Sequence, residues 1–235
     1  MYTPTSPPPP PDSGLDFLVI FLVLFVIGGG ALLGAALVRR RAEKRQRGLM
    51  GLAAELGLQF NASDEIDIPT RFGYFEPLAA GERQASNVIS GKFNGHEVLA
   101  FDFWSRLGKV SSSLSAVIAP LGHKFPGLEI YPEGMFSKAA EALADIDFES
   151  QEFSSKFLVK CPDRKFAYAV ITPQVMEFLL ANPGWKLDMR GSAVIAYTGK
   201  VWRPEEFKQA IKVLTGLLDL IPDYIWKDRA GGMPG

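Results

Sequence analysis

The sequence predicts an α+β protein in which one N-terminal transmembrane helix precedes a soluble domain of antiparallel hairpins, or a meander, packed with helices. Three observations predict it. Residues 17–38 form an uncharged apolar run, Asn94-Gly95 joins two strand-like segments, and residues 203–222 carry an apolar stripe at helical spacing. Strands and helices do not alternate as in a parallel α/β sheet, and the soluble part could form one domain or two small lobes.

The N-terminal apolar run is predicted to span a membrane. Its 22 residues (17–38) give about 33 Å of helix, which matches a hydrocarbon core of about 30 Å. A cleaved signal peptide is the alternative, but it would need a basic leader before the apolar run. Residues 1–16 contain no Lys or Arg and are rich in proline, so we expect a disordered leader followed by a retained anchor.

Six basic residues follow the apolar run and predict its orientation. They are Arg39, Arg40, Arg41, Lys44, Arg45 and Arg47. Because Lys and Arg beside a span stay on the cytoplasmic side, we expect the leader outside the cell and the domain in the cytoplasm, at the inner (plasma) membrane. The juxtamembrane segment 39–48 could also contact anionic lipid headgroups, or it could serve only to stop transfer of the chain.

Small residues within the apolar run suggest a helix–helix contact. Gly30 and Gly34 lie four positions apart, a spacing that lets two membrane helices approach closely. Glycine is common in membrane helices, so both a weak homodimer and a chance spacing remain open.

The soluble body, 49–222, begins with a helix and a hairpin. Residues 49–56 have apolar positions at helical spacing before Gly57, a common helix terminator. Asn and Gly both tolerate positive φ, so a two-residue turn at Asn94-Gly95 pairs Phe93 with His96. Stepping outward, this register places Lys92 opposite Glu97, Val88 opposite Phe101 and Asn87 opposite Asp102.

The later segments are assigned from their periodicity and turn residues. We expect the segment after residue 60 to be a loop with short ordered pieces. Segment 166–171 is ambiguous between helix and strand, and Thr172-Pro173 is typical of a helix start. The other expected elements are strands at 110–119, 128–132 and 156–161, helices at 136–146, 173–181 and 203–222, a second hairpin at 185–199 and a flexible tail at 223–235.

Composition excludes several classes of function. Cys161 is the only cysteine, so no intrachain disulfide can form, which fits a reducing compartment. His96 and His123 are the only histidines, and no metal-ligand spacing occurs, so we expect no metal and no cofactor. After position 47 the chain has 19 basic and 23 acidic side chains, a net of −4, which argues against nucleic-acid binding. The acidic segment 64–67 is predicted to be a solvated loop in preference to a cation site.

One polar site is worth testing, although no catalytic residue is predicted. Asn87 and Asp102 lie among apolar residues on the hairpin, and Trp104 follows on the same strand. A hydrogen-bonded structural pair is the simpler interpretation. The alternative is a carboxylate-dependent enzyme in which Asp102 acts together with Glu97 or Asp163.

The segment around residues 149–181 has a recognisable motif, and related positions lie upstream. The motif consists of Phe153, Phe157, Val159, Asp163, Ala167, Thr172, Pro173, Met176, Glu177 and Leu180, with Asn87, Gly91, Gly95, Phe101 and Asp102 upstream. This pattern resembles an uncharacterised bacterial family of membrane-anchored proteins with a domain of unknown function. Cys161-Pro162 departs from this pattern. The resemblance covers roughly residues 49–221 and implies a shared architecture, but it carries no activity, ligand or catalytic residue.

Taken together, these features predict a single-pass membrane protein whose cytoplasmic domain is a non-catalytic protein-binding or scaffold module. Its partners would be the lipid bilayer and a protein. A membrane-proximal enzyme is one alternative. A lipid-binding domain is the other, because the basic segment and the aromatic-rich strands would suit a lipid.

Overall fold

Helix α1 (Ser13–Leu56) opens a computed structural model that describes residues 13–134 and 146–230. The chain divides into two units, Met1–Arg47 and Gly48–Gly235. The portion after Gly48 is therefore one unit, and the possibility of two small lobes is not realised. The leader 1–12, most of the predicted helix 136–146 and the end of the tail, 231–235, lie outside the described residues.

The first unit contains the predicted span and most of the basic segment. Within the described part of the chain, no helix is both long and apolar enough to cross a membrane. Most side chains of the predicted span, those of 17–20 and 23–33, lie outside the described part of the chain. The span therefore stays a prediction. Most of the six basic side chains are exposed, and Arg39 donates to Glu43 at 3.0 Å.

The end of α1 confirms the predicted terminator. Gly57 adopts φ 69°, and the N–H groups of Gly57 and Leu58 donate to the carbonyls of Ala54 and Ala53 at 3.3 and 2.8 Å. A glycine in this left-handed conformation stops a helix while satisfying its last carbonyls. Helix α1 is continuous through Gly48.

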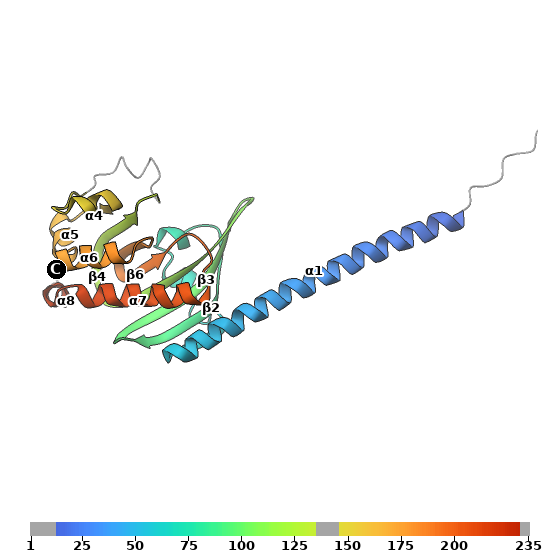
Figure 1. Ribbon diagram of the computed structural model, residues 1–235, viewed down its shortest axis with the longest axis horizontal. Coiled ribbons are helices and arrows are strands. Elements are labelled where there is room, and N and C mark those ends of the chain that lie inside the picture. Colours follow the sequence, from blue (N-terminus) through green and yellow to red (C-terminus); the bar gives the residue numbers. More distant parts are fainter. Residues whose placement is uncertain (1–12, 135–145, 231–235) are drawn as a thin grey trace, which may run out of the picture. The chain divides into compact units, whose positions relative to one another are not determined.

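Six antiparallel strands form one sheet in the second unit (Figure 1). They are β1 (Gln59–Ser63), β2 (Glu82–Phe93), β3 (His96–Leu107), β4 (Val110–Pro132), β5 (Phe157–Lys160) and β6 (Lys186–Tyr197). The order is β1-β2-β3-β4-β5, and β6 also pairs with β4. The predicted α+β domain with antiparallel hairpins is confirmed.

The β2–β3 hairpin follows the predicted register only near its turn. Phe93 pairs with His96 and Lys92 with Glu97, as expected. Between Ser86 and Ile89 the register shifts, because Asn87 adopts φ 52° and forms a bulge. Ser86 therefore pairs with Asp102 in the ladder, and the predicted ladder pair Asn87–Asp102 is wrong. The predicted pair Val88–Phe101 falls within the bulge, between the two registers.

Two other strand predictions are corrected. The separate strands 110–119 and 128–132 are parts of β4, which stays paired with β6 across two register shifts. The predicted second hairpin, 185–199, is wrong: β6 runs through it as one strand. Gly191 adopts φ 56° opposite Phe125, where the register shifts, so it accommodates an irregularity in the ladder instead of a turn.

Short helices lie between some of the strands, and the longer α7 and then α8 follow the last strand. They are α2 (Ile68–Arg71), the 3₁₀ turn η1 (Glu76–Leu78), α4 (Gln151–Lys156), α5 (Arg164–Val170), α6 (Pro173–Ala181), α7 (Pro204–Leu220) and α8 (Asp223–Ala230). The predicted helices α6 and α7 are confirmed, and the ambiguous segment 166–171 is largely helix α5. The prediction of a flexible tail is wrong for residues 223–230, which form α8. There Ile225 is buried, and the ring of Trp226 packs edge-on against Phe125, with ring centroids 5.4 Å apart.

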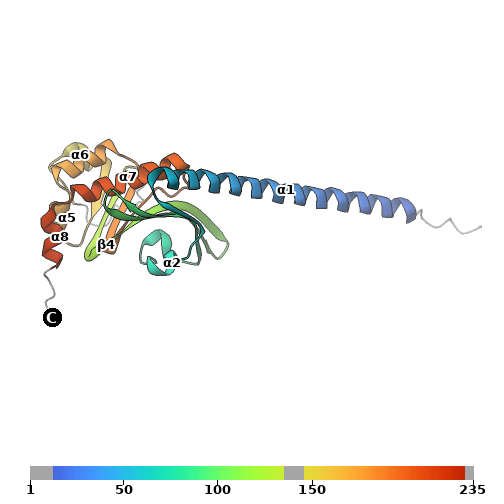
Figure 2. The ribbon, with the colours of Figure 1, turned by 90° about the horizontal axis from the view of Figure 1, so that it is seen from below.

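The sheet lies between two layers of the second unit. Figure 2 shows α7 on one side of it and α2 on the other. The apolar stripe of α7 is buried, as its periodicity predicts. Trp202, just before α7, is fully buried between Trp185 and Phe207, with ring centroids 5.1 and 5.2 Å away.

Candidate functional site

The structure brings together two of the three residues of the predicted polar site. The bulge turns the side chain of Asn87 toward β3, and its Nδ2 donates to Asp102 Oδ2 at 2.8 Å. The other carboxylate oxygen, Oδ1, accepts from the Ser115 hydroxyl on β4 at 2.6 Å. Both oxygens of Asp102 are thus held by protein groups on neighbouring strands.

Ser115 extends this network to the segment before α7. Its side chain is fully buried, and its Oγ accepts from the backbone N–H of Trp202 at 2.9 Å. Its own N–H donates to the carbonyl of Lys200 at 2.9 Å. The chain Asn87–Asp102–Ser115–Trp202 therefore ties three strands to the start of α7, and we call it the Asp102 network. Sequence reasoning missed Ser115, although a two-residue turn at Gly108-Lys109 would have placed it opposite Asp102.

Trp104 lies outside this network, and the two acids proposed to act with Asp102, Glu97 and Asp163, have other partners. Trp104 pairs with Gln84 and Ser113 in the ladder, and its ring contacts the Arg106 guanidinium at 6.0 Å. Asp163 caps α5 by accepting from the N–H of Phe166 at 3.0 Å, and Glu97 pairs with Lys92 near the hairpin turn. The alternative in which Asp102 acts together with Glu97 or Asp163 stays a prediction.

A second polar cluster, which the sequence analysis missed, lies on β6 and β4. Lys186, Asp188 and Arg190 alternate along β6 and so share one face of the sheet. Lys186 Nζ donates to Glu76 Oε2 of η1 at 2.6 Å and lies 4.2 Å from the ring centroid of Tyr131. We use the name Asp188 cluster for the side chains of β6 and β4 that gather here: Lys186, Asp188, Arg190, Tyr197, Glu129 and Tyr131.

Opposite charges balance one another inside the Asp188 cluster. Arg190 Nε donates to Asp188 Oδ1 at 2.8 Å, and its terminal nitrogen also binds Glu129. The Tyr131 hydroxyl donates to the same Glu129 carboxylate. Asp188 is only 2% exposed, so its charge is balanced within the protein and this carboxylate offers little surface to a substrate.

Burial shifts the proton affinities of the Asp188 cluster. Loss of water around the carboxyl raises the pKa of Asp188 to about 6, although its hydrogen bond to Arg190 opposes this. Burial, with neighbouring carboxylates, also raises the pKa of Tyr131 and of Tyr197, so both phenols stay neutral. Alternation of charged residues in "KLDMR" could have revealed the cluster, had that segment been assigned to a continuous strand.

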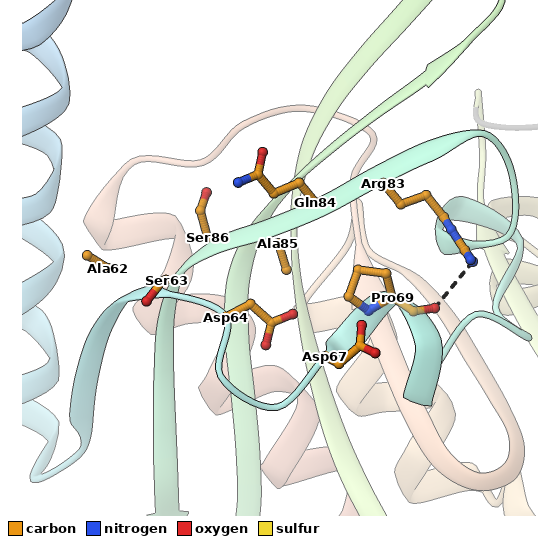
Figure 3. A pocket seen from close by; sticks show the side chains of 9 residues that line it. All are labelled: Ala62, Ser63, Asp64, Asp67, Pro69, Arg83, Gln84, Ala85 and Ser86. Carbon is orange, nitrogen blue, oxygen red and sulfur yellow. Dashed lines mark hydrogen bonds between the residues drawn. The ribbon is translucent and has the colours of Figure 1, made fainter.

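The acidic loop before α2 borders a cavity of about 370 Å³ (Figure 3). Two of the charged side chains that line it bind protein groups. Asp64 accepts from the N–H groups of Ile66 and Ile68 at 3.1 and 2.7 Å, and Arg83 donates to the carbonyls of Pro69 and Leu78 at 3.2 and 3.0 Å. Among residues 13–134 and 146–230, no group of three or more His, Cys, Asp or Glu side chains is placed to hold a metal ion.

Two further hollows adjoin the turn of the β2–β3 hairpin. The larger, about 570 Å³, lies between Lys92, the β4 segment 120–122 and Trp226. His96 on its border pairs with Asp219 at 2.7 Å, which joins the hairpin to the end of α7. The smaller, about 300 Å³, extends from Lys92 toward Arg71. Both hollows have mixed apolar and charged borders.

Comparison with known proteins identifies a shared fold. No family model matches the chain, and no curated protein matches it. The crystal structure of the mycobacterial trehalose monomycolate transport factor A, TtfA, superposes with a TM-score of 0.57 at 12% sequence identity, covering 75% of this chain and 96% of that chain. At this identity the likeness concerns the fold, so the chain has an α+β architecture similar to that of a transport factor.

Proposed function

We propose that this chain is a single-pass membrane-anchored binding protein whose α+β domain recognises a protein partner in the cytoplasm and catalyses no reaction. The Asp102 network carries the proposal. An acid or base needs a carboxylate that can reach a substrate, whereas both oxygens of Asp102 are bound by Asn87 and Ser115. These bonds join strands, which is a structural role.

The anchor in this proposal rests on the sequence of α1. Residues 17–38 carry no charge, and six basic residues follow them within the same helix. A tether of this kind raises the local concentration of the domain at the bilayer, which strengthens weak recognition. The resemblance to membrane-anchored bacterial proteins with a domain of unknown function supports the same proposal.

A lipid-handling role is the second candidate. It is favoured by the fold shared with a protein named as a trehalose monomycolate transport factor. The hollow beside Leu121 and Trp226 has the apolar side chains that a lipid tail would contact. In this case the domain would bind a lipid in place of, or together with, a protein.

Affinity capture of the full-length chain from detergent-solubilised membranes separates these functions. The capture is done with and without prior crosslinking in cells, and we expect the same protein partner in repeated captures. A partner that is recovered only after crosslinking would be one that binds weakly. Reproducible enrichment of one lipid class without a protein would support the second candidate. A bound metabolite that the purified chain converts to product would contradict both, because the domain would then be an enzyme.

The orientation of the anchor gives a separate prediction. We expect alkaline carbonate to leave the full-length chain in the membrane pellet, since only integral proteins resist it. A phosphatase reporter, active only outside the cytoplasm, should be inactive at the C-terminus, after residue 235. Activity there, together with retention in the pellet, would reverse the proposed orientation but keep the anchor.

Association through the span can be tested at Gly34. A Cβ at this position would meet nothing within 4 Å, so Gly34→Leu should leave the isolated helix intact. If Gly30 and Gly34 form a close helix–helix contact, the leucine should lower crosslinked dimer severalfold by preventing close approach. Leu37→Ala, on an exposed position of the same helix, is the matched control. Equal crosslinking of all three chains would remove the homodimer.

A further inference from the structure

The hairpin between β3 and β4 ends in an apolar tip. Leu107 and Val110 pair across the turn at Gly108-Lys109, where Gly108 adopts φ 61°. They are 67% and 72% exposed, more than any other large apolar side chain described from Gly48 onward. Two adjacent apolar side chains held out on a paired hairpin form a preorganised contact surface.

Cationic and aromatic groups surround this tip. Lys109 occupies the turn itself, and Arg106 precedes Leu107 on β3. The Arg106 guanidinium lies 6.0 Å from the centre of the Trp104 ring and pairs with Glu82 at 3.0 Å. With Lys109 added, this end of the hairpin keeps a net positive charge. Segments that enter the interface of a bilayer typically have apolar residues at their tip and Lys, Arg and Trp next to that tip.

We propose that the tip, Leu107–Val110, inserts into an anionic lipid surface, namely the bilayer that anchors the chain. The inference rests on the proposed anchor. Charge complementarity favours an anionic lipid surface over a neutral apolar partner, because Lys109 lies between the two apolar side chains. The exposed Leu107 and Val110 favour it over a purely acidic partner, which would offer them no apolar surface. The domain would then have two membrane contacts, α1 and the hairpin tip, and the pair would fix its orientation at the surface.

The tether makes this small tip sufficient. Two apolar side chains bind a bilayer weakly from solution. Only residues 39–47 separate the predicted span from the domain in the chain, so the tether between them is short. Insertion of the tip is therefore an intramolecular event, favoured by a high effective concentration.

The test uses the full-length chain reconstituted into vesicles of phosphatidylcholine alone or mixed with phosphatidylglycerol. In a Cys161→Ser background, Val110→Cys carries an environment-sensitive fluorophore, and lipids with a doxyl group on the acyl chain quench it on insertion. A label at Lys165→Cys, on an exposed site of α5 far from this hairpin in the domain, is the control (Figure 1). We expect strong quenching at position 110 in the mixed vesicles and little at position 165.

Two substitutions separate the apolar and charged contributions. Leu107→Gln should lower the ratio of inserted to free tip about tenfold in both vesicle types, since burial of one leucine is lost. Lys109→Gln should lower it about fivefold in the mixed vesicles and leave it unchanged in phosphatidylcholine, because only the attraction to anionic headgroups is removed. Both positions are exposed, so thermal unfolding should be unaffected.

Carbonate extraction of the same vesicles distinguishes the two levels of the proposal. Release of the chain would contradict the proposed anchor itself. A retained chain whose label at position 110 is no more quenched than that at 165 would overturn the insertion and leave the anchor intact. Protection of position 110 only after a soluble protein is added would also overturn it, in favour of a protein contact at the tip.

Discussion

Ser115→Ala is expected to lower the free energy of unfolding by about 2–4 kcal/mol. The hydroxyl donates to Asp102 and accepts from the N–H of Trp202, so its removal takes a partner from two polar groups. The loss of one hydrogen-bond partner by a buried polar group costs about 1–3 kcal/mol, and here the buried Trp202 N–H and the half-buried Asp102 carboxylate each lose one. Denaturant unfolding of the full-length protein in mild detergent, followed by tryptophan fluorescence, measures the change.

Ser113→Ala is the matched control, because Ser113 lies on the same strand but is exposed. It should change stability by less than about 0.5 kcal/mol. A double-mutant cycle of Ser115→Ala with Asn87→Ala should show coupling, since both side chains bind the same carboxylate. Additive effects, or equal effects of the two serine substitutions, would contradict the structural role that we assign to the Asp102 network.

Asp188→Asn is expected to change how stability depends on pH. The folded protein raises the pKa of this carboxyl from an ordinary value of 3.8 to about 6. Between these values the folded state binds the proton more tightly than the unfolded chain, so stability falls as pH rises from about 4 to about 6 and stays lower above that range. The shift corresponds to about 3 kcal/mol. The asparagine variant cannot lose a proton and should lack this decline.

Unfolding curves of both proteins at several pH values give the measurement, and the difference between them isolates Asp188 from all other titrating groups. Glu149→Gln, at an exposed position, should leave the pH dependence close to that of the wild type. Parallel curves for wild type and Asp188→Asn would show that Arg190 and solvent keep this carboxylate ionised at its ordinary pKa. An increasing advantage of the wild type above pH 6 would reverse the expected sign.

Local patterns predicted the elements that depend on local chemistry. The stripe of α7, the Thr172 cap of α6 and the Asn94-Gly95 turn were each readable, because spacing, a hydroxyl acceptor and tolerance of positive φ act within a few residues. Several positions that carry the family resemblance have this kind of role: Asp163 and Thr172 cap helices, and Gly95 forms a turn.

Elements that depend on distant neighbours were predicted less well. Gly191 looked like part of a turn, yet β4 pairs with β6 on both sides of it and keeps the chain extended. The bulge at Asn87 changed a register that was correct nearer the turn. It still brought Asn87 to Asp102, because the bulged side chain reaches across the ladder. Neither effect leaves a signal within the segment itself.

By itself the sequence determined the helical periodicities, the turn chemistry, the uncharged run and the basic segment that follows it, since each is a property of neighbouring residues. Only the tertiary structure decided that Ser115 completes the Asp102 network and that Glu76, more than a hundred positions before Lys186, pairs with it. The physical reason is that burial and hydrogen bonding join residues from separate strands, and their partners are fixed only when the sheet closes.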